Sequence, residues 1–103
     1  MDISTWLSST GLAGTEDHFV QAPAYPYYVF NDKVTVTGAD MKNLITRHSI
    51  GLELYAPVRN ADAESRIERL LDASAIPYEK ERFWISSEKH LETLYTFVVI
   101  ETT

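Results

Sequence analysis

The chain has 103 residues, a formal net charge of −6 and no cysteine. The length is typical of one domain, so we expect residues 1–103 to form a single domain. The lack of cysteine excludes disulfides, a thiolate zinc site and a cysteine nucleophile. The basic residues are scattered, with no cluster beyond Lys80 and Arg82, which argues against a stripe that binds nucleic-acid phosphates.

Residues 1–6 contain an acid and no basic residue, so we expect no signal peptide. The apolar stretch 97–100 is far shorter than the roughly 20 residues that span a bilayer, so we expect no membrane association. Asp2 or Ser4 can cap a short helix that runs to about Thr10 and ends at the glycines that follow. Because the segment contains weak helix formers, a loose arm is the alternative.

Residues 23–30 contain two prolines and predict an edge strand that begins after Pro26. The polar residues 31–33 then indicate a turn, and the β-branched residues 34–37 indicate a short return strand or an extended arm. Since the segment is polar and is broken by a glycine, we expect residues 31–43 to form a mobile arm.

Residues 44–56 give the clearest strand, with apolar side chains at the even positions, which we expect to face the core. Asn60 is a suitable N-cap for a helix to about Ala75, with Asp62 and Arg66 as a favourable pair on its surface. The apolar stripe of this helix consists of Ala63, Ile67, Leu70 and Leu71. Its acidic stripe, which we expect to be solvated, consists of Glu64, Glu68 and Asp72.

Two further strands are predicted at residues 81–85 and 93–100. The second has apolar residues on both faces, which is typical of a strand that is central in its sheet or has one face covered by something else. Together the elements predict an α+β fold, with a mainly antiparallel sheet of about four to five strands and two helices packed on one face. The other face of the sheet would then need a neighbour.

Candidate catalytic and metal-binding residues are sparse. The histidines at 18, 48 and 90 form no closely spaced pair for a metal ion. His48 lies on the apolar face of the long strand, where we expect a core or edge histidine bonded to a backbone group. No Gly-x-Ser-x-Gly elbow and no glycine-rich phosphate loop occurs. We therefore predict no catalytic, cofactor-binding or metal-binding residues, no cofactor and no enzymatic activity.

The surplus of aromatic side chains indicates that the protein works through its surfaces. A domain of this size buries only roughly 60–65% of the surface of its unfolded chain, yet this chain has 6 Tyr, 4 Phe and 2 Trp. Residues 23–28 combine prolines with tyrosines, although an edge strand that packs its own tyrosines is the alternative. Trp84 either covers the outer face of the sheet or enters an interface. The candidate protein–protein interface consists of Tyr25, Tyr27, Tyr28, Trp84, Tyr95 and Phe97.

An ordered series of short segments covers about residues 20–100. It consists of Pro-Ala-Tyr-Pro-Tyr-Tyr-Val-Phe at 23–30, Thr-Gly-Ala-Asp at 37–40, His-Ser-Ile-Gly-Leu-Glu-Leu-Tyr at 48–55, the acidic helix 62–71, Ile-Pro-Tyr-Glu-Lys at 76–80, Trp-Ile-Ser-Ser-Glu at 84–88 and Leu-Tyr-Thr-Phe at 94–97. In its order and spacing, this series resembles the small tail-completion (tail-terminator, head–tail joining) proteins of phages and prophages of Gram-positive bacteria.

The resemblance implies a virion structural protein that is assembled in the host cytoplasm and lies at the head-proximal end of the tail. Such proteins form rings, commonly hexamers, that end growth of the tail tube and join the tail to the head. The implied partners are other copies of the chain, the tail-tube protein and head–tail connector proteins. DNA would pass through the ring without specific binding, which suits an acidic chain because negative walls repel phosphates.

A second hypothesis remains open from the residues alone. A small acidic α+β domain also suits a cytoplasmic binding or regulatory module with a ferredoxin-like sheet. Such a module would have a concave pocket or form a stable dimer.

Overall fold

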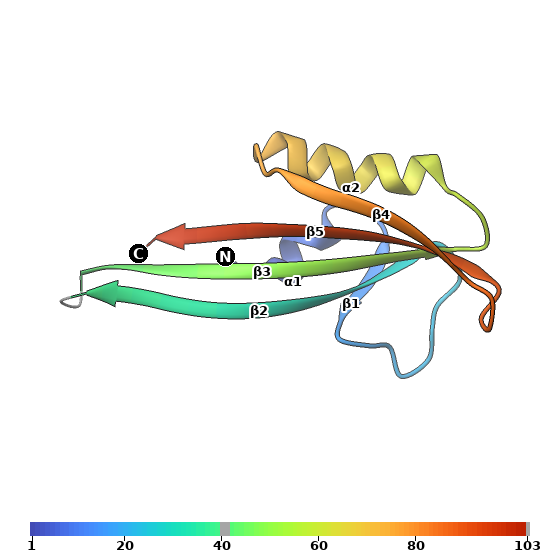
Figure 1. Cartoon of the computed structure of the whole chain (residues 1–103), viewed down its shortest axis with the longest axis horizontal. Coiled ribbons are helices and arrows are strands. Elements are labelled where there is room, and N and C mark those ends of the chain that lie inside the picture. Colours follow the sequence, from blue (N-terminus) through green and yellow to red (C-terminus); the bar gives the residue numbers. More distant parts are fainter. Residues whose placement is uncertain (40–41, 103) are drawn as a thin grey trace.

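The computed structural model describes residues 1–39 and 42–102. Their elements form a single sheet with two helices (Figure 1). In chain order the elements are α1 (Ile3–Ser8), β1 (Ala13–Glu16), β2 (Tyr27–Ala39), β3 (Lys42–Ala56), α2 (Ala61–Ala73), β4 (Tyr78–Ile85) and β5 (His90–Thr102).

The sheet has five strands in the order β1-β2-β3-β5-β4. β1 runs parallel to β2, and every other neighbouring pair is antiparallel. This confirms the predicted α+β fold with a mainly antiparallel sheet. Helix α2 connects β3 to β4, and β5 lies between these two strands. The order of elements is not the β-α-β-β-α-β order of a ferredoxin-like domain, so the ferredoxin-like part of the second hypothesis is wrong.

Strand register explains why one face of the sheet forms the core. Residues that are paired across strands share a face, and Leu52 of β3 is paired with Phe30 and Tyr95, all three of them buried. Ile3 and Leu7 of α1 and Ile67 and Leu71 of α2 belong to the same buried cluster. Both helices therefore cover one face, which we call the helix face. Of the even positions of β3, Ile50, Leu52 and Leu54 lie in the core as predicted, whereas Leu44 is 42% exposed because it lies beyond the helices. We call the opposite face the open face.

Local signals set the limits of both helices. The side chain of Asp2 accepts a hydrogen bond from the backbone N–H of Ser4 at 3.0 Å, so Asp2 is the N-cap of α1. The side chain of Asn60 accepts from the backbone N–H of Ala63 at 3.0 Å, as predicted for α2. Helix α2 ends at Ala73, slightly earlier than the expected end, and Ala75 follows in the left-handed region with φ of 54°.

The predicted turn at residues 31–33 is wrong, because β2 continues through them as a strand of 13 residues. The side chains of Asn31 and Asp32 find hydrogen-bond partners on β3 rather than in a turn. Asn31 Oδ1 accepts from the backbone N–H of Gly51 at 3.2 Å, and Asp32 Oδ2 lies 2.8 Å from His48 Nδ1. Residues 34–37 are therefore not a return strand, because they continue β2 in its original direction and pair with β3. Of the predicted mobile arm, residues 40 and 41 lie outside the described residues, and its mobility stays a prediction.

Strand β1 was not predicted from the sequence. It pairs with β2 only over residues 27–30. Gly14 lies flat against the ring of the buried Tyr28, and a Cβ at this position would come within 2.0 Å of that ring. The missing side chain therefore allows β1 to approach the sheet this closely.

Candidate interaction surfaces

Three of the six predicted interface residues lie in the protein's own core. Tyr28, Tyr95 and Phe97 have 2%, 0% and 3% of their surface exposed. The register places all three on the helix face, under α1 and α2. Since they already pack inside the subunit, they cannot offer a contact surface, and this part of the prediction is corrected.

Tyr25 and Tyr27 form an aromatic group at one end of the open face. Their rings are stacked with centroids 5.5 Å apart, and the ring of Tyr27 lies 5.4 Å from that of Tyr55. The hydroxyl of Tyr25 lies 3.0 Å from Nδ1 of His90. Tyr25 is exposed and Tyr27 is half-buried, so both can still contact another molecule. Their role in an interface stays a prediction.

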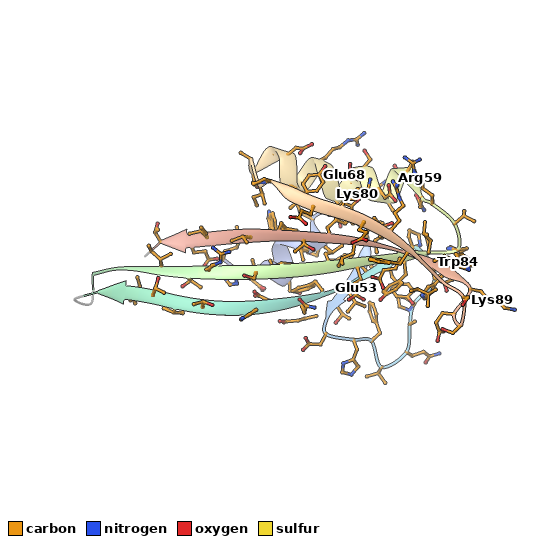
Figure 2. All side chains as sticks on the ribbon, viewed as in Figure 1. Glu53, Arg59, Glu68, Lys80, Trp84 and Lys89 are labelled. Carbon is orange, nitrogen blue, oxygen red and sulfur yellow. The ribbon has the colours of Figure 1, made fainter. Side chains whose placement is uncertain are left out.

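Trp84 and the C-terminal end of β2 lie at opposite ends of the molecule, with Trp84 on the right in Figure 2. It is paired with Leu91, which is paired in turn with the buried Ala56, so its side chain is on the helix face. With 58% of its surface exposed, it packs only in part against the subunit. Of the two alternatives for Trp84, cover of the outer face is therefore wrong, and contact with a partner stays a prediction.

An acidic hollow of about 380 Å³ lies beside the aromatic group on the open face. Its described lining carries acidic side chains and no lysine or arginine. The acidic residues are Asp17, Glu53, Glu88 and Glu92. The hydroxyl of Tyr55 donates to Glu53 and lies 3.3 Å from Oε1 of Glu92. Because one hydroxyl has a single proton, the two carboxylates share one donor.

The burial and the closeness of the carboxylates change the pKa values of Glu92 and Tyr55, two of the side chains that line the hollow. Burial, with a further contribution from the carboxylate of Glu53, raises the pKa of Glu92 above its usual range. Burial also raises the pKa of Tyr55, and the hydrogen bond to Glu53 adds to this. Both shifts favour the neutral forms of these groups.

We expect Glu92→Gln to raise the free energy of unfolding by about 0.2–1 kcal/mol at pH 7, because it removes a carboxylate beside Glu53. A carboxyl whose pKa is raised on folding stabilises the fold below its unfolded pKa, and this contribution is lost as the pH rises through the folded pKa. The gain should therefore shrink toward pH 4. Urea unfolding at both pH values measures it, and a loss of stability at pH 7 would contradict this account.

A larger hollow of about 700 Å³ lies over the middle of the open face, where Gly51 has no side chain. Lys33, Arg47 and Glu79 line it, together with small polar residues and with apolar residues that include Tyr78 and Val98. The open face thus carries acidic groups toward the aromatic end and basic groups toward the end of β2.

His48 is buried, as predicted, but its partner is a side chain and not a backbone group. Nδ1 lies 2.8 Å from Asp32 Oδ2, and Nε2 lies 3.7 Å from Glu101 Oε1. The hydrogen bond to Asp32 therefore ties β3 to β2. Among residues 1–39 and 42–102, no group of His, Asp and Glu side chains is placed to hold a metal ion.

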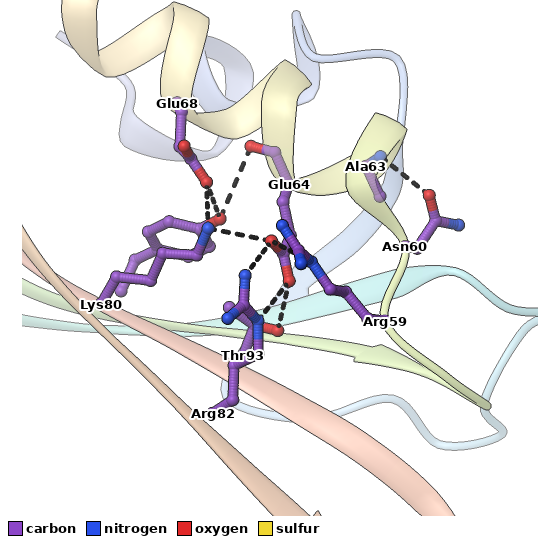
Figure 3. A network of polar contacts seen from close by, with 9 residues as sticks. Arg59, Asn60, Ala63, Glu64, Glu68, Lys80, Arg82 and Thr93 are labelled. Atoms are coloured by element: carbon purple, nitrogen blue, oxygen red, sulfur yellow. Dashed lines mark hydrogen bonds and ion pairs between the residues drawn. The ribbon is translucent and has the colours of Figure 1, made fainter.

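The acidic stripe of α2 is not solvated as a whole. Glu64 is only 3% exposed, and its carboxylate accepts hydrogen bonds from the sheet (Figure 3). Arg82 binds both of its oxygens, at 3.0 and 2.7 Å, and Thr93 Oγ1 donates at 3.0 Å. Lys80 Nζ lies 2.9 Å from Glu64 and 2.7 Å from Glu68. Asp72 is exposed, as predicted.

Glu64 therefore joins α2 to β4 and β5 through a buried ion pair. Burial alone would raise the pKa of Glu64, but the hydrogen bonds from Arg82, Lys80 and Thr93 outweigh it and lower the pKa to about 2. Arg59 lies nearby in the sequence, with Nε 3.9 Å from Oε1 of Glu64, but the residues that hydrogen-bond the carboxylate, Lys80, Arg82 and Thr93, lie 16 or more positions away along the chain. Helical periodicity could not identify them.

Comparison with known proteins gives a likeness in structure alone. No family model matches the chain, and no curated protein matches it. A chain in the solved structure of the virion of a native gene transfer agent (GTA) particle is similar, with a TM-score of 0.59 and 12% sequence identity. The match covers 94% of this chain and 84% of that chain. The two chains share a fold. In the described part of the sequence, no helix has the length and apolar character needed to cross a membrane.

Proposed function

We propose that the chain is a structural subunit of a phage-like virion and forms a tail-terminator ring that ends growth of the tail tube and joins the tail to the head. The observation that carries this proposal is the fold shared with a component of a gene transfer agent virion. The ordered segments of the sequence, which resemble tail-completion proteins, support the finer assignment.

The surfaces of the subunit suit assembly. The helices cover only the helix face, while the open face presents aromatic residues and two hollows. β2 also carries exposed apolar side chains, since Val34 and Val36 are about half exposed. Exposed apolar surface of this kind is typical of a contact with another subunit. We propose that the protein acts through such contacts, as a hexameric ring, and not through a catalytic site.

The charge of the chain suits a ring through which DNA passes. Each copy carries a formal net charge of −6, and a negative wall repels phosphates. We propose that DNA passes without specific binding and that the tail-tube and connector proteins are the partners. The ring would then belong to the virion at the head-proximal end of the tail, after assembly in the host cytoplasm.

A small cytoplasmic binding module is the second candidate, and the two hollows of the open face are the observation in its favour. Such a module would bind its ligand as a monomer or a dimer. It would not change the length of tail tubes.

Negative-stain electron microscopy of the purified protein tests the proposed function. The protein is imaged alone at increasing concentration and with polymerised tail-tube protein from the same genome. We expect ring-shaped particles, or tubes that carry a cap at one end and stop growing. A protein that stays monomeric and leaves the length of the tubes unchanged would contradict the proposal.

A further inference from the structure

Two edges of the sheet are unpaired at the same end of the molecule. Among the described residues, β1 covers β2 only over residues 27–30, and β4 covers β5 only as far as Phe97. We call the three-stranded part beyond these points the arm. It consists of residues 31–39 of β2, 44–51 of β3 and 98–102 of β5. Figure 1 shows the arm extending away from α2, with β3 between its two outer strands.

The backbone of β2 presents hydrogen-bonding groups on its free edge. The carbonyl of Phe30 accepts from the backbone N–H of Asp17 at 2.8 Å, on the side where β1 lies. Since backbone groups alternate in direction along a strand, Val34 and Val36 present their N–H and C=O groups on that same side, now uncovered. Thr35 lies between these two residues, so its backbone N–H and C=O groups point to the other side, toward β3.

Residues 34–37 of β2 and 98–100 of β5 lack the run of charges that the outer edge of β4 carries. The outer edge of β4 carries the consecutive charges of residues 79–82, a pattern that discourages strand pairing. Residues 34–37 of β2 are uncharged and β-branched, which favours an extended strand. Residues 98–100 of β5 are likewise uncharged and β-branched. The arm edges therefore match each other in chemistry, and the β4 edge differs from both.

We propose that the free edge of β2 in one copy pairs with the free edge of β5 in the next copy, so that the arms join into one continuous sheet. β2 and β5 run in the same direction, because each is antiparallel to β3. Copies related by rotation about an axis along the strands keep every strand direction, so the new pair is parallel. The two edges lie on opposite sides of the arm, and such a head-to-tail contact closes into a ring when its rotation allows.

The inference rests on the proposed function, because it supplies the contact between subunits of the ring. A second copy is the occupant favoured by the structure, since each arm carries both edges of the junction. Pairing of β2 with a strand of the tail-tube protein, or of β2 with β2, would be a different arrangement.

Engineered cysteines test the pairing, and the natural chain contains none. Thr35 of β2 and Ile100 of β5 are both paired with Arg47, so they lie on the open face two strand spacings apart. That separation is roughly 9.6 Å, beyond the roughly 7 Å limit for a disulfide within one chain. We expect Thr35→Cys combined with Ile100→Cys to give a ladder of covalent oligomers on mild oxidation. Thr37→Cys combined with Ile100→Cys covers a neighbouring register.

Two controls decide between arrangements. Thr35→Cys combined with Glu81→Cys tests the charged β4 edge, and a ladder from this pair instead would overturn the proposal. Thr35→Cys alone tests pairing of β2 with β2, and efficient dimers from it would also overturn the proposal. The proposal would also be overturned if neither of the two Ile100→Cys pairs gave covalent oligomers. This is measured under conditions in which the unmodified protein assembles, including the presence of tail tubes.

Proline substitution tests the backbone hydrogen bonds separately. Val34→Pro removes an N–H that points to the free edge, so the subunit should keep its circular dichroism spectrum while ring assembly weakens at least about tenfold. Val34→Thr keeps the N–H and should assemble within about twofold of the unmodified protein. Thr35→Pro removes an N–H that points to β3 and should unfold the hairpin. Full assembly by a folded Val34→Pro variant would contradict the pairing.

The two proposals fail in different ways. Rings or capped tubes without the predicted disulfide ladder would overturn the edge pairing and leave the proposed function standing. A protein that neither forms rings nor acts on tail tubes would overturn the proposed function itself.

Discussion

Replacing Tyr95 by alanine is expected to lower the free energy of unfolding by about 3–5 kcal/mol. Tyr95 is fully buried, its ring packs beside that of Tyr78, and its hydroxyl donates to Glu68 at 2.6 Å. Truncation leaves a cavity between α2 and the sheet and removes the donor of that hydrogen bond. Urea unfolding followed by circular dichroism measures the loss.

Tyr25→Ala provides the matched control. Tyr25 is exposed on the open face, so its truncation should change the free energy of unfolding by less than about 1 kcal/mol. If Tyr25 contacts a neighbouring subunit, the same change weakens assembly without unfolding the subunit. If the Tyr95→Ala subunit kept its free energy of unfolding but no longer assembled, Tyr95 would be an interface residue. That result would contradict its assignment to the core.

Glu64→Gln is expected to lower the free energy of unfolding by about 2–3 kcal/mol at pH 7. The carboxylate is buried and binds Arg82, Lys80 and Thr93, and these partners lower its pKa to about 2 from the ordinary 4.5. Such a difference corresponds to roughly 3 kcal/mol. Because Lys80 and Arg82 are partly exposed and regain water when the carboxylate is lost, the measured effect should fall somewhat below this figure.

The loss should depend on pH in a defined direction. A carboxyl with a lowered pKa stabilises the fold fully above its unfolded pKa of 4.5, and this stability is lost as the pH falls toward about 2. The difference between the unmodified protein and Glu64→Gln should therefore be constant above about pH 5 and shrink below it. Unfolding curves from about pH 2 to about pH 7 test this, because they cover both the folded pKa of about 2 and the ordinary value of 4.5.

Asp62→Asn is the control for a surface carboxylate on the same helix. Asp62 is exposed and pairs with Arg66 at 3.0 Å, so its removal should cost less than about 1 kcal/mol. Equal losses from Asp62→Asn and Glu64→Gln would show that helix charge, and not the buried ion pair, determines the stability.

Much of the local structure could be predicted from the sequence because its signals lie within a few residues. Asn60 caps α2 as predicted, and Ile50, Leu52 and Leu54 of β3 face the core as predicted. The central place of β5, which its apolar residues on both faces predicted, is also confirmed, since β5 lies between β3 and β4. Caps and side-chain alternation are properties of one segment, so they can be read without knowledge of the rest of the chain.

The candidate surfaces could be predicted only in part. A tyrosine in a strand has the same local pattern whether its face is covered by a helix or open to solvent. Tyr28 lies under the helices, whereas Tyr27, the residue before it, lies on the open face. Composition indicated that aromatic surface exists but not which ring belongs to the core, because that depends on which face α1 and α2 cover.

The sequence by itself determined the α+β class, the acidic charge and the caps and faces of the main elements. Only the tertiary structure decided that β2 runs unbroken through its polar residues, because Asn31 and Asp32 find their partners on β3. It also decided that Glu64 is a buried anchor and not part of a solvated stripe. In each case the deciding partner lies on another element, and long-range pairing is set by sheet register rather than by the residues nearby.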